Sequence, residues 1–473
     1  MSGIGRARAT SAVSPAERRV GTDTSSGTGG ARASWLLYAA IPVLSALNAV
    51  VGLVLPMLLG PLSFGEYSLA TTLFQYGLIF DLGLSQTIDR RVPILLQQDR
   101  SALDLFVSNV MGLRLVIGVM AMTVGTGLLG VLAATDRLPF RFIDGTLSLA
   151  AGLSFMIALG AMSVWRAQSN RRAFALSSVA TGLALAVARP VGIVAAGITG
   201  SFALLFMAYA ALAIVLPRRL PPPRATIPPP RLTARFIVQS LPLFMTSILW
   251  AVYMTANRWV VSFFAPPLEL GRFAFGANVL ALVVGMVAAI SQFYYPAVAI
   301  RVAAGPRGSV SRLLLRDLAL LAGAGLVIGV GGILVGPALI ELLYRNFVGA
   351  EVPMRILLVA LPSLLVCSWL VPLGLATATR PWLESAVTLP LALLTLGVAT
   401  AAGDRIAGID GSAWGSCIAA GVLLALLLGA FGRNGLMAWR HVLPLFALAA
   451  LATAALAVLA ASPVMLHLLT QNG

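Results

Sequence analysis

Four charged side chains fall inside long apolar stretches of the sequence, namely Asp81, Arg114, Arg189 and Arg258. A charge in the hydrocarbon of a membrane is costly unless it faces a water-filled cavity or a partner of opposite charge. Arginine keeps its charge when desolvated and binds phosphate oxygens through a planar pair of N–H groups. The three arginines are therefore candidates for lining a cavity that binds an anion.

Asp81 and Arg114 lie at similar depths in neighbouring predicted spans. At 1.5 Å per residue, they are roughly 12 and 15 Å from the cytoplasmic ends of these spans. An ion pair between them is therefore predicted. Two interpretations remain open for Asp81: it stabilises the fold through this pair, or it is a protonatable carboxylate that couples transport to a flow of ions or protons.

Arg189 directly precedes Pro190, which removes a helix hydrogen bond and predicts a kink. A kink beside an arginine fits a cavity wall, although Arg189 and Arg258 could also extend toward the outer membrane interface. Neutral polar side chains share the apolar stretches, and they either line the same cavity or form hydrogen bonds between helices. They are Asn48, Gln75, Asn257, Asn278 and Gln292.

The elements that must position these residues are membrane helices. The chain has 473 residues, of which 59% are hydrophobic and 10% charged, against roughly 45–50% and about 25% in soluble domains. Apolar stretches of twenty or more residues recur along it, which indicates an all-α polytopic membrane protein and excludes soluble enzymes and disulfide scaffolds. Thirteen spans are predicted, with twelve or fourteen as alternatives: 36–59, 66–89, 105–134, 146–166, 173–196, 198–216, 236–265, 271–299, 315–343, 354–377, 383–402, 411–431 and 442–462.

All 32 basic residues are arginines, and the formal net charge is +16. If the N-terminus is cytoplasmic, most of these arginines fall in cytoplasmic loops, as the positive-inside rule requires. The charge thus indicates orientation in a cytoplasmic (inner) membrane, and no nucleic-acid partner is expected.

Composition divides the chain into five parts. Residues 1–34 form a basic tail that is expected to be disordered and cytoplasmic. Residues 217–235, rich in proline and arginine, predict an extended cytoplasmic tether. The tether separates two six-helix lobes, 35–216 and 236–432, and residues 433–473 add one or more C-terminal spans.

An internal repeat relates the two predicted lobes. The segment Pro61-Leu62-Ser63-Phe64-Gly65-Glu66-Tyr67 recurs, at a constant offset, as Pro267-Leu268-Glu269-Leu270-Gly271-Arg272-Phe273. In both copies a short outer turn precedes the glycine, and an aromatic residue follows it two positions later. A duplication of this kind is common in transporter folds.

At these residues the sequence resembles the polysaccharide and lipid-linked oligosaccharide flippase family, related to the multidrug and toxin extrusion transporters of one exporter superfamily. The first half carries the motif Phe64-Gly65-x-Tyr67-Ser68-Leu69, then Asp81-Leu82-Gly83-Leu84, Arg90-Arg91 and Pro93. The second half carries Asn257-Arg258, Leu270-Gly271-x-Phe273 and Tyr295-Pro296. Where the family often has an aspartate before this arginine, the chain has Asn257.

The resemblance implies two lobes around a central cavity that opens alternately to each side of the membrane. It implies a flippase for a polyprenyl-pyrophosphate-linked oligosaccharide, with the arginines binding pyrophosphate and the neutral polar residues binding sugar hydroxyls. Membrane lipids and polysaccharide-assembly proteins are the expected partners. Structural roles are expected for the motif residues Gly65, Tyr67, Gly83, Gly271 and Phe273.

Two other functions stay as alternatives: a small-molecule or drug antiporter of the same superfamily, and a membrane-embedded polysaccharide polymerase or glycosyltransferase. The predicted outer loops are short, which disfavours an enzyme. Sequence motifs for ATP hydrolysis, metal binding or a catalytic nucleophile do not occur. We therefore expect no catalytic residues, no metal and no cofactor.

Overall fold

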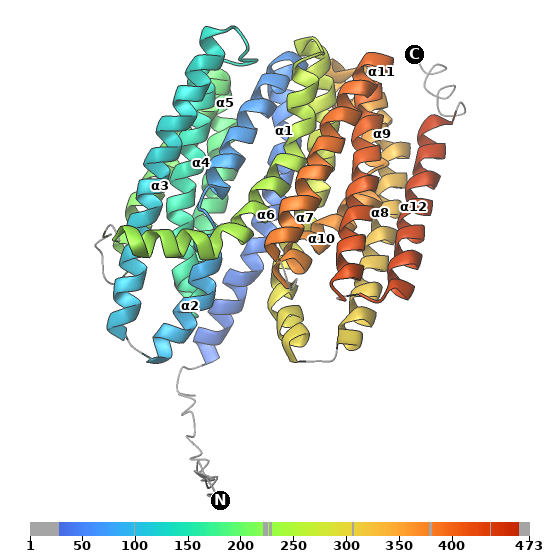
Figure 1. The fold of residues 1–473 in the computed structure, drawn as a ribbon. Helices are drawn as coiled ribbons and strands as arrows, with labels where there is room; N and C mark the ends of the chain where they lie inside the picture. Colours follow the sequence, from blue (N-terminus) through green and yellow to red (C-terminus); the bar gives the residue numbers. More distant parts are fainter. Residues whose placement is uncertain are drawn as a thin grey trace, which may run out of the picture.

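Helices make up almost the whole of the computed structural model, which describes residues 28–462 with gaps at 99, 221–225, 227–228, 305–306, 378–380 and 436, and some helical residues by backbone alone. Figure 1 shows α1, α6 and α7 in the middle, with α2 to α5 on one side and α8 to α12 on the other. The elements are α1 (Thr28–Ile79), α2 (Leu84–Gln98), α3 (Arg100–Ala134), α4 (Phe142–Ala167), α5 (Arg171–Arg218), α6 (Pro230–Ser262), α7 (Pro267–Ala304), α8 (Arg307–Leu343), the 3₁₀ turn η1 (Arg345–Phe347), α9 (Glu351–Leu358), α10 (Leu361–Thr377), α11 (Pro381–Arg433) and α12 (Trp439–Ala461).

Three of these helices are too long to cross a bilayer once, and each is broken at a glycine. The breaks lie at Gly60 in α1, Gly197 in α5 and Gly408 in α11, with φ values of 70, 64 and 59°. Glycine adopts positive φ because it has no Cβ. Each helix thus forms two arms, and every span predicted from the sequence has a helical counterpart.

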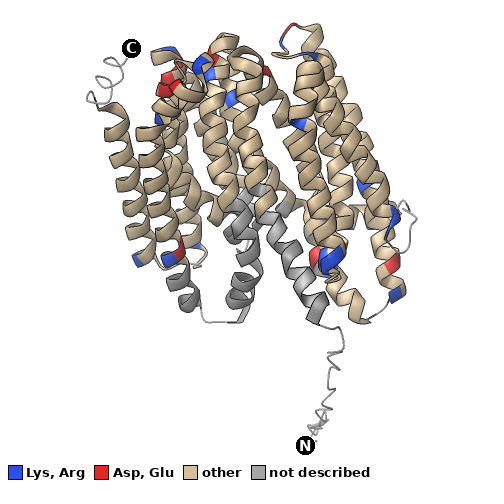
Figure 2. Cartoon of the chain, turned by 180° about the vertical axis from the view of Figure 1, so that it is seen from behind, with Lys and Arg blue, Asp and Glu red and all other residues tan. Residues whose placement is uncertain are grey.

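The described residues include eight helices that are long and apolar enough to cross a membrane, or nine if α9 and α10, bent by 53°, form one span. Large apolar side chains on the outside are exposed, for example Val194 at 76% and Leu451 at 70%. Figure 2 shows the charged residues gathered at the two ends of the bundle, with few along the middle of the helices. An apolar belt between two charged ends is the surface of a multi-pass membrane protein.

The structure corrects three predicted boundaries. The second span, predicted as 66–89, ends at Ile79, because a turn separates α1 from α2. The tether is shorter than 217–235, since α5 continues to Arg218 and α6 begins at Pro230, a proline at a helix start where its missing N–H costs nothing. The first helix begins at Thr28, ahead of the expected position, and residues 1–27 of the predicted tail lie outside the described part.

The two glycines of the sequence repeat contact each other. A Cβ placed on Gly65 of α1 would lie 3.0 Å from the backbone nitrogen of Gly271 in α7. Nearby, the Tyr344 hydroxyl donates to the Leu53 carbonyl at 2.8 Å, and the Phe64 and Phe347 rings pack edge to face. The two halves of the chain therefore meet at this end of the bundle, which we name the Gly65 end.

A second repeated feature is visible in the structure. Ala196–Gly197 in α5 and Ala407–Gly408 in α11 break their helices with nearly the same φ and ψ values. Both breaks carry the pattern Gly-x-x-x-Ala-Gly-Ile-x-Gly, beginning at Gly192 and at Gly403. The outer glycines of each pattern approach each other closely. Both repeated features agree with the duplication that the sequence predicts.

Replacing Gly271 by alanine is expected to open the Gly65 end. The added Cβ would overlap the Pro61 backbone, and an overlap with backbone is relieved only by moving α7 away from α1. A cysteine at Ser68, which lines the internal cavity, should then react severalfold faster with an impermeant thiol reagent. Gly331→Ala on α8, where nothing lies within 4 Å, is the control, and equal labelling of both variants would contradict the expectation.

Candidate functional site

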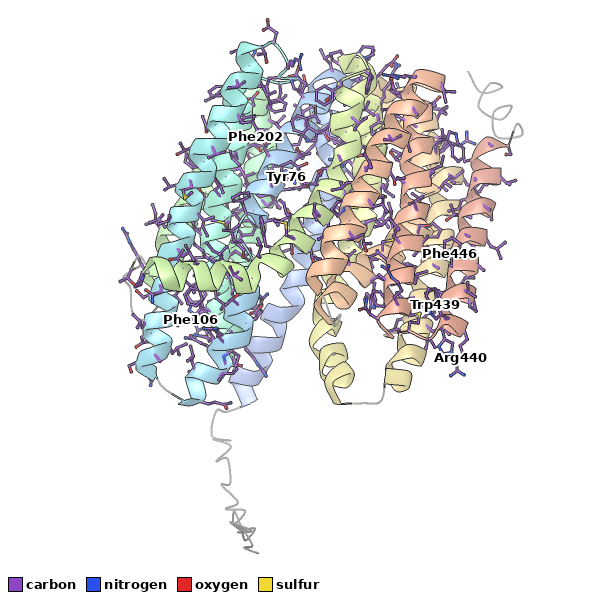
Figure 3. All side chains as sticks on the ribbon, in the orientation of Figure 1. Tyr76, Phe106, Phe202, Trp439, Arg440 and Phe446 are labelled. Carbon is purple, nitrogen blue, oxygen red and sulfur yellow. The ribbon has the colours of Figure 1, made fainter. Side chains whose placement is uncertain are left out.

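An internal cavity of about 210 Å³ lies between α1, α5, α6 and α7. Figure 3 places two of the aromatic residues of this region, Phe202 and Tyr76, between the α3–α5 group and the middle helices. Because α1 and α5 come from the first half of the chain and α6 and α7 from the second, the cavity lies between the predicted lobes. Polar groups line it on all four helices: Asn48, Tyr67, Ser68, Thr71, Gln75, Arg189, Arg258 and Asn278.

Arg189 is held in the cavity wall by aromatic residues. Its Nε donates a hydrogen bond to the Tyr67 hydroxyl at 2.8 Å, and its Cζ lies 5.8 Å from the centre of the Tyr67 ring. The Tyr67 ring in turn stacks on Phe202 at 5.2 Å. These contacts orient the guanidinium and leave its two terminal amino groups for a ligand, since no carboxylate in the described residues forms an ion pair with it.

Arg258 is a buried cation without a counter-ion among the described residues. Its exposed fraction is 4%, and its Nε has no hydrogen-bond partner. The α6 backbone around it is fixed, because Trp259 donates to Thr72 on α1 at 2.9 Å and Thr255 bonds the Tyr76 hydroxyl at 2.6 Å. The positive charge of this guanidinium is best neutralised by an anionic ligand in the cavity.

Three of the predicted neutral residues line the same cavity, namely Asn48, Gln75 and Asn278. Asn48 donates through Nδ2 to the carbonyls of Leu44 and Gly182, at 2.9 and 3.3 Å, and its Oδ1 is buried without a partner. Asn278 donates to the Gly52 carbonyl at 3.1 Å. The asparagine amino groups thus link helices, as one interpretation predicted, while the Asn48 oxygen is still able to accept a bond from a ligand hydroxyl.

Sequence reasoning missed Ser68 and Thr71, which line the cavity next to Gln75. The sequence does contain a pattern that indicates them, because Phe64, Ser68, Thr71 and Gln75 are spaced as one face of a helix. Hydropathy does not detect this face, since single hydroxyls barely lower the mean value of an apolar stretch. The helical spacing would have identified both residues.

The structure confirms the predicted Asp81–Arg114 ion pair but corrects its surroundings. The Arg114 side chain is fully buried, and its Nη2 lies 3.0 Å from Asp81 Oδ2. The guanidinium also donates to the Ser85 hydroxyl and the Met156 carbonyl, both at 2.7 Å. Because these partners occupy its terminal amino groups, Arg114 does not line the cavity, and the expectation that all three arginines share it is wrong.

Asp81 lies in the turn between α1 and α2, not inside a span as predicted. Its Oδ1 accepts the N–H of Gly83 at 2.9 Å, and its Oδ2 accepts the N–H of Ser85 at 3.0 Å. The carboxylate therefore satisfies the free N–H groups at the start of α2, as an N-terminal cap does. Together with Arg114 it fixes this turn to α3 and α4.

The remaining predicted residues lie elsewhere. Asn257 faces a smaller cavity of about 20 Å³ beside Tyr253 and Ser416, and its Oδ1 accepts the backbone N–H of Arg258 at 2.9 Å. The Gln292 side chain lies outside the described residues. Gly83 packs against the Ser240 backbone on α6, and Phe273 is completely buried. Across the described residues, no cluster of His, Cys, Asp and Glu could hold a metal ion.

Comparison with solved structures shows the fold. The lipid II flippase MurJ in an inward closed conformation aligns with 91% of this chain and 100% of its own, at 12% identity and a TM-score of 0.63. An inward-facing multidrug resistance MATE transporter of the MOP superfamily aligns with 84% of this chain and 98% of its own, at 14% identity and a TM-score of 0.64. The Vibrio cholerae MATE transporter VcmN aligns with 87% of this chain and 99% of its own, at 16% identity and a TM-score of 0.59.

No curated protein matches the sequence significantly. A family model described as polysaccharide biosynthesis protein matches residues 31–300, more than half of the chain and the part that holds the whole cavity. The chain therefore belongs to the polysaccharide biosynthesis protein family, and its helices have the fold of the MOP-superfamily transporters.

Proposed function

We propose that the protein is a flippase that moves a polyprenyl-pyrophosphate-linked oligosaccharide, or a related glycolipid precursor, across the cytoplasmic membrane for cell-surface polysaccharide biosynthesis. The observation that carries this proposal is the pair of arginines in one cavity, Arg189 from α5 and Arg258 from α6. None of the described residues that line this cavity is a carboxylate. A desolvated site with two guanidinium groups and no opposing carboxylate favours a phosphate-bearing substrate over a cationic drug.

The remaining groups of the cavity suit the rest of such a substrate. The Asn48 oxygen, the hydroxyls of Ser68 and Thr71 and the Gln75 amide can exchange hydrogen bonds with sugar hydroxyls. The Tyr67 and Phe202 rings offer flat apolar faces for a sugar ring. No covalent chemistry is required of any of them, which is consistent with a transporter that is not an enzyme.

We propose that transport occurs by alternating access between lobes 35–216 and 236–432. The cavity volume of about 210 Å³ is below the roughly 300–1,000 Å³ of ordinary ligand pockets, so an oligosaccharide enters only when the lobes separate. In this proposal the Gly65–Gly271 contact, next to the cavity-lining Phe64, closes one end of the cavity and breaks when the lobes separate. In this proposal the N-terminus and the tether are cytoplasmic, as the arginine distribution predicts.

A flipping assay with purified protein in liposomes tests the substrate class. The probe is a fluorescent polyprenyl-pyrophosphate-linked hexose, whose label is reduced by dithionite only in the outer leaflet. The protein is expected to make the inner-leaflet label reducible and to leave a neutral lipid-linked hexose without pyrophosphate unmoved. Equal movement of the neutral lipid would refute pyrophosphate recognition, and transport of a cationic dye in place of both lipids would indicate the antiporter.

A further inference from the structure

Four exposed arginines lie at the two ends of α5. Arg171 and Arg172 begin the helix, and Arg218 and Arg219 end it. None of them takes part in either ion pair found among the described residues. The Asp89 carboxylate at the same end is already bound by Arg166, at 2.6 Å.

The fold of α5 brings these ends together. The helix reverses at Gly197, so its two arms run side by side, and the Tyr209 hydroxyl of the second arm donates to the Thr181 carbonyl of the first at 3.3 Å. Farther along, Leu216 of the second arm and Leu220 just after it belong to an apolar cluster against which Ala173 and Phe174 of the first arm pack. Arg171 and Arg172 are therefore at the same end of the bundle as Arg218 and Arg219, and we name these four residues the hairpin arginines.

The surface directly next to the hairpin arginines is apolar. Leu176 on the first arm is 49% exposed, and Ile214 on the second arm is 52% exposed. Each is within about one helical turn of an arginine, roughly 6 Å along the axis. The hairpin arginines therefore begin where the apolar surface ends, which is the depth of the lipid headgroups.

The hairpin itself does not require these charges. The matching break in α11 allows the two hairpins to be aligned, and the positions that correspond to the hairpin arginines are Trp382, Leu383, Gly429 and Ala430. The α11 hairpin thus has the same architecture with no cation at these four positions, and its last turn carries a single arginine, Arg433. The positive-inside rule accounts for arginines on one side of the membrane, but not for their concentration at a single helix pair.

We propose that the hairpin arginines form a binding site for the phosphate groups of anionic membrane lipids. Clusters of four or more arginines at the membrane surface attract anionic headgroups, and the exposed apolar residues beside this cluster supply a surface for the same lipid's acyl chains. That continuity with the acyl-chain surface selects a lipid over an acidic protein. The site is separate from the cavity and does not depend on the proposed substrate.

The test uses purified full-length protein in phosphatidylcholine liposomes with trace spin-labelled phosphatidylglycerol or spin-labelled phosphatidylcholine. The fraction of each probe immobilised by the protein gives a relative association constant. The wild type is expected to prefer phosphatidylglycerol by about fivefold or more, the effect of even one arginine at an anionic surface. The preference should fall in 0.5 M salt, because salt screens exposed charges.

The variant Arg171→Gln/Arg172→Gln/Arg218→Gln/Arg219→Gln is expected to lose this preference. A control with the same loss of charge replaces four scattered, exposed arginines, Arg100, Arg137, Arg345 and Arg440, by glutamine and should keep it. Retention of the preference by the first variant, or an equal loss in both, overturns the proposal. If the fourfold variant does not fold, the two double variants are measured instead, and full preference in both of them likewise overturns the proposal.

Discussion

Replacement of Arg258 by alanine is expected to reduce transport of the pyrophosphate-linked lipid by about 100-fold while the protein still folds. Hydrogen bonds to charged groups contribute about 1.5–3 kcal/mol each, so losing a bidentate pair removes at least ~3 kcal/mol of binding. Folding should be preserved, because the buried Arg258 Nε has no partner to leave unsatisfied and no ion pair is broken among the described residues. Dithionite-detected flipping by equal amounts of purified protein measures the effect.

The conservative variant separates charge from geometry. Arg258→Lys keeps the positive charge but cannot form the planar fork, so it should recover part of the transport and not all of it. Arg440→Ala, on α12 at the edge of the bundle (Figure 3) and exposed, is the control and should transport normally. Normal transport by Arg258→Ala would contradict the role of this residue in binding pyrophosphate.

The helices could be predicted from the sequence because the hydropathy of a single local stretch identifies a membrane helix. Apolar stretches located α3, α4, α8 and α12, and the predicted boundaries between 196 and 198 and between 402 and 411 contain the breaks at Gly197 and Gly408. The turn at Asp81 was missed because Leu82, Leu84 and Ile88 continue the apolar stretch through it. Hydropathy averages over such a turn, whereas the turn itself is determined by the bonds that Asp81 accepts from Gly83 and Ser85.

The site could be predicted only in part, because a cavity is a tertiary feature. Arg114, Arg189 and Arg258 look alike in the sequence, since each is a lone arginine in an apolar stretch. What distinguishes them is whether partners from other helices occupy the terminal amino groups of the guanidinium, as they do at Arg114 but not at Arg189, which bonds Tyr67 through Nε. Arg114 has Asp81, Ser85 and Met156, whereas Arg258 has no such partner among the described residues. The Asp81–Arg114 pair could be predicted because the two residues lie at similar depths in neighbouring predicted spans.

The Asp81–Arg114 pair is expected to contribute strongly to folding stability. Replacing Arg114 by methionine is expected to cost about 3–5 kcal/mol of stability, because it leaves the largely buried Asp81 carboxylate without its cation. Asp81→Asn should be similarly harmful, since it leaves a fully buried guanidinium charged and unpaired. Thermal unfolding of the purified variants in detergent gives the loss, and Asp89→Asn, at the half-exposed ion pair with Arg166, should cost about 1 kcal/mol or less.

The double variant Asp81→Asn/Arg114→Met decides between the two roles that the sequence left open for Asp81. Without a buried charge of either sign, it should be more stable than either single variant, which gives a favourable coupling energy in a double-mutant cycle. Asparagine can still accept the Gly83 N–H through its side-chain oxygen, so the start of α2 stays capped. If Asp81 only stabilises the turn, flipping returns together with stability. If Asp81 carries a transported proton or ion, the double variant folds and does not flip its substrate, because asparagine cannot exchange that charge.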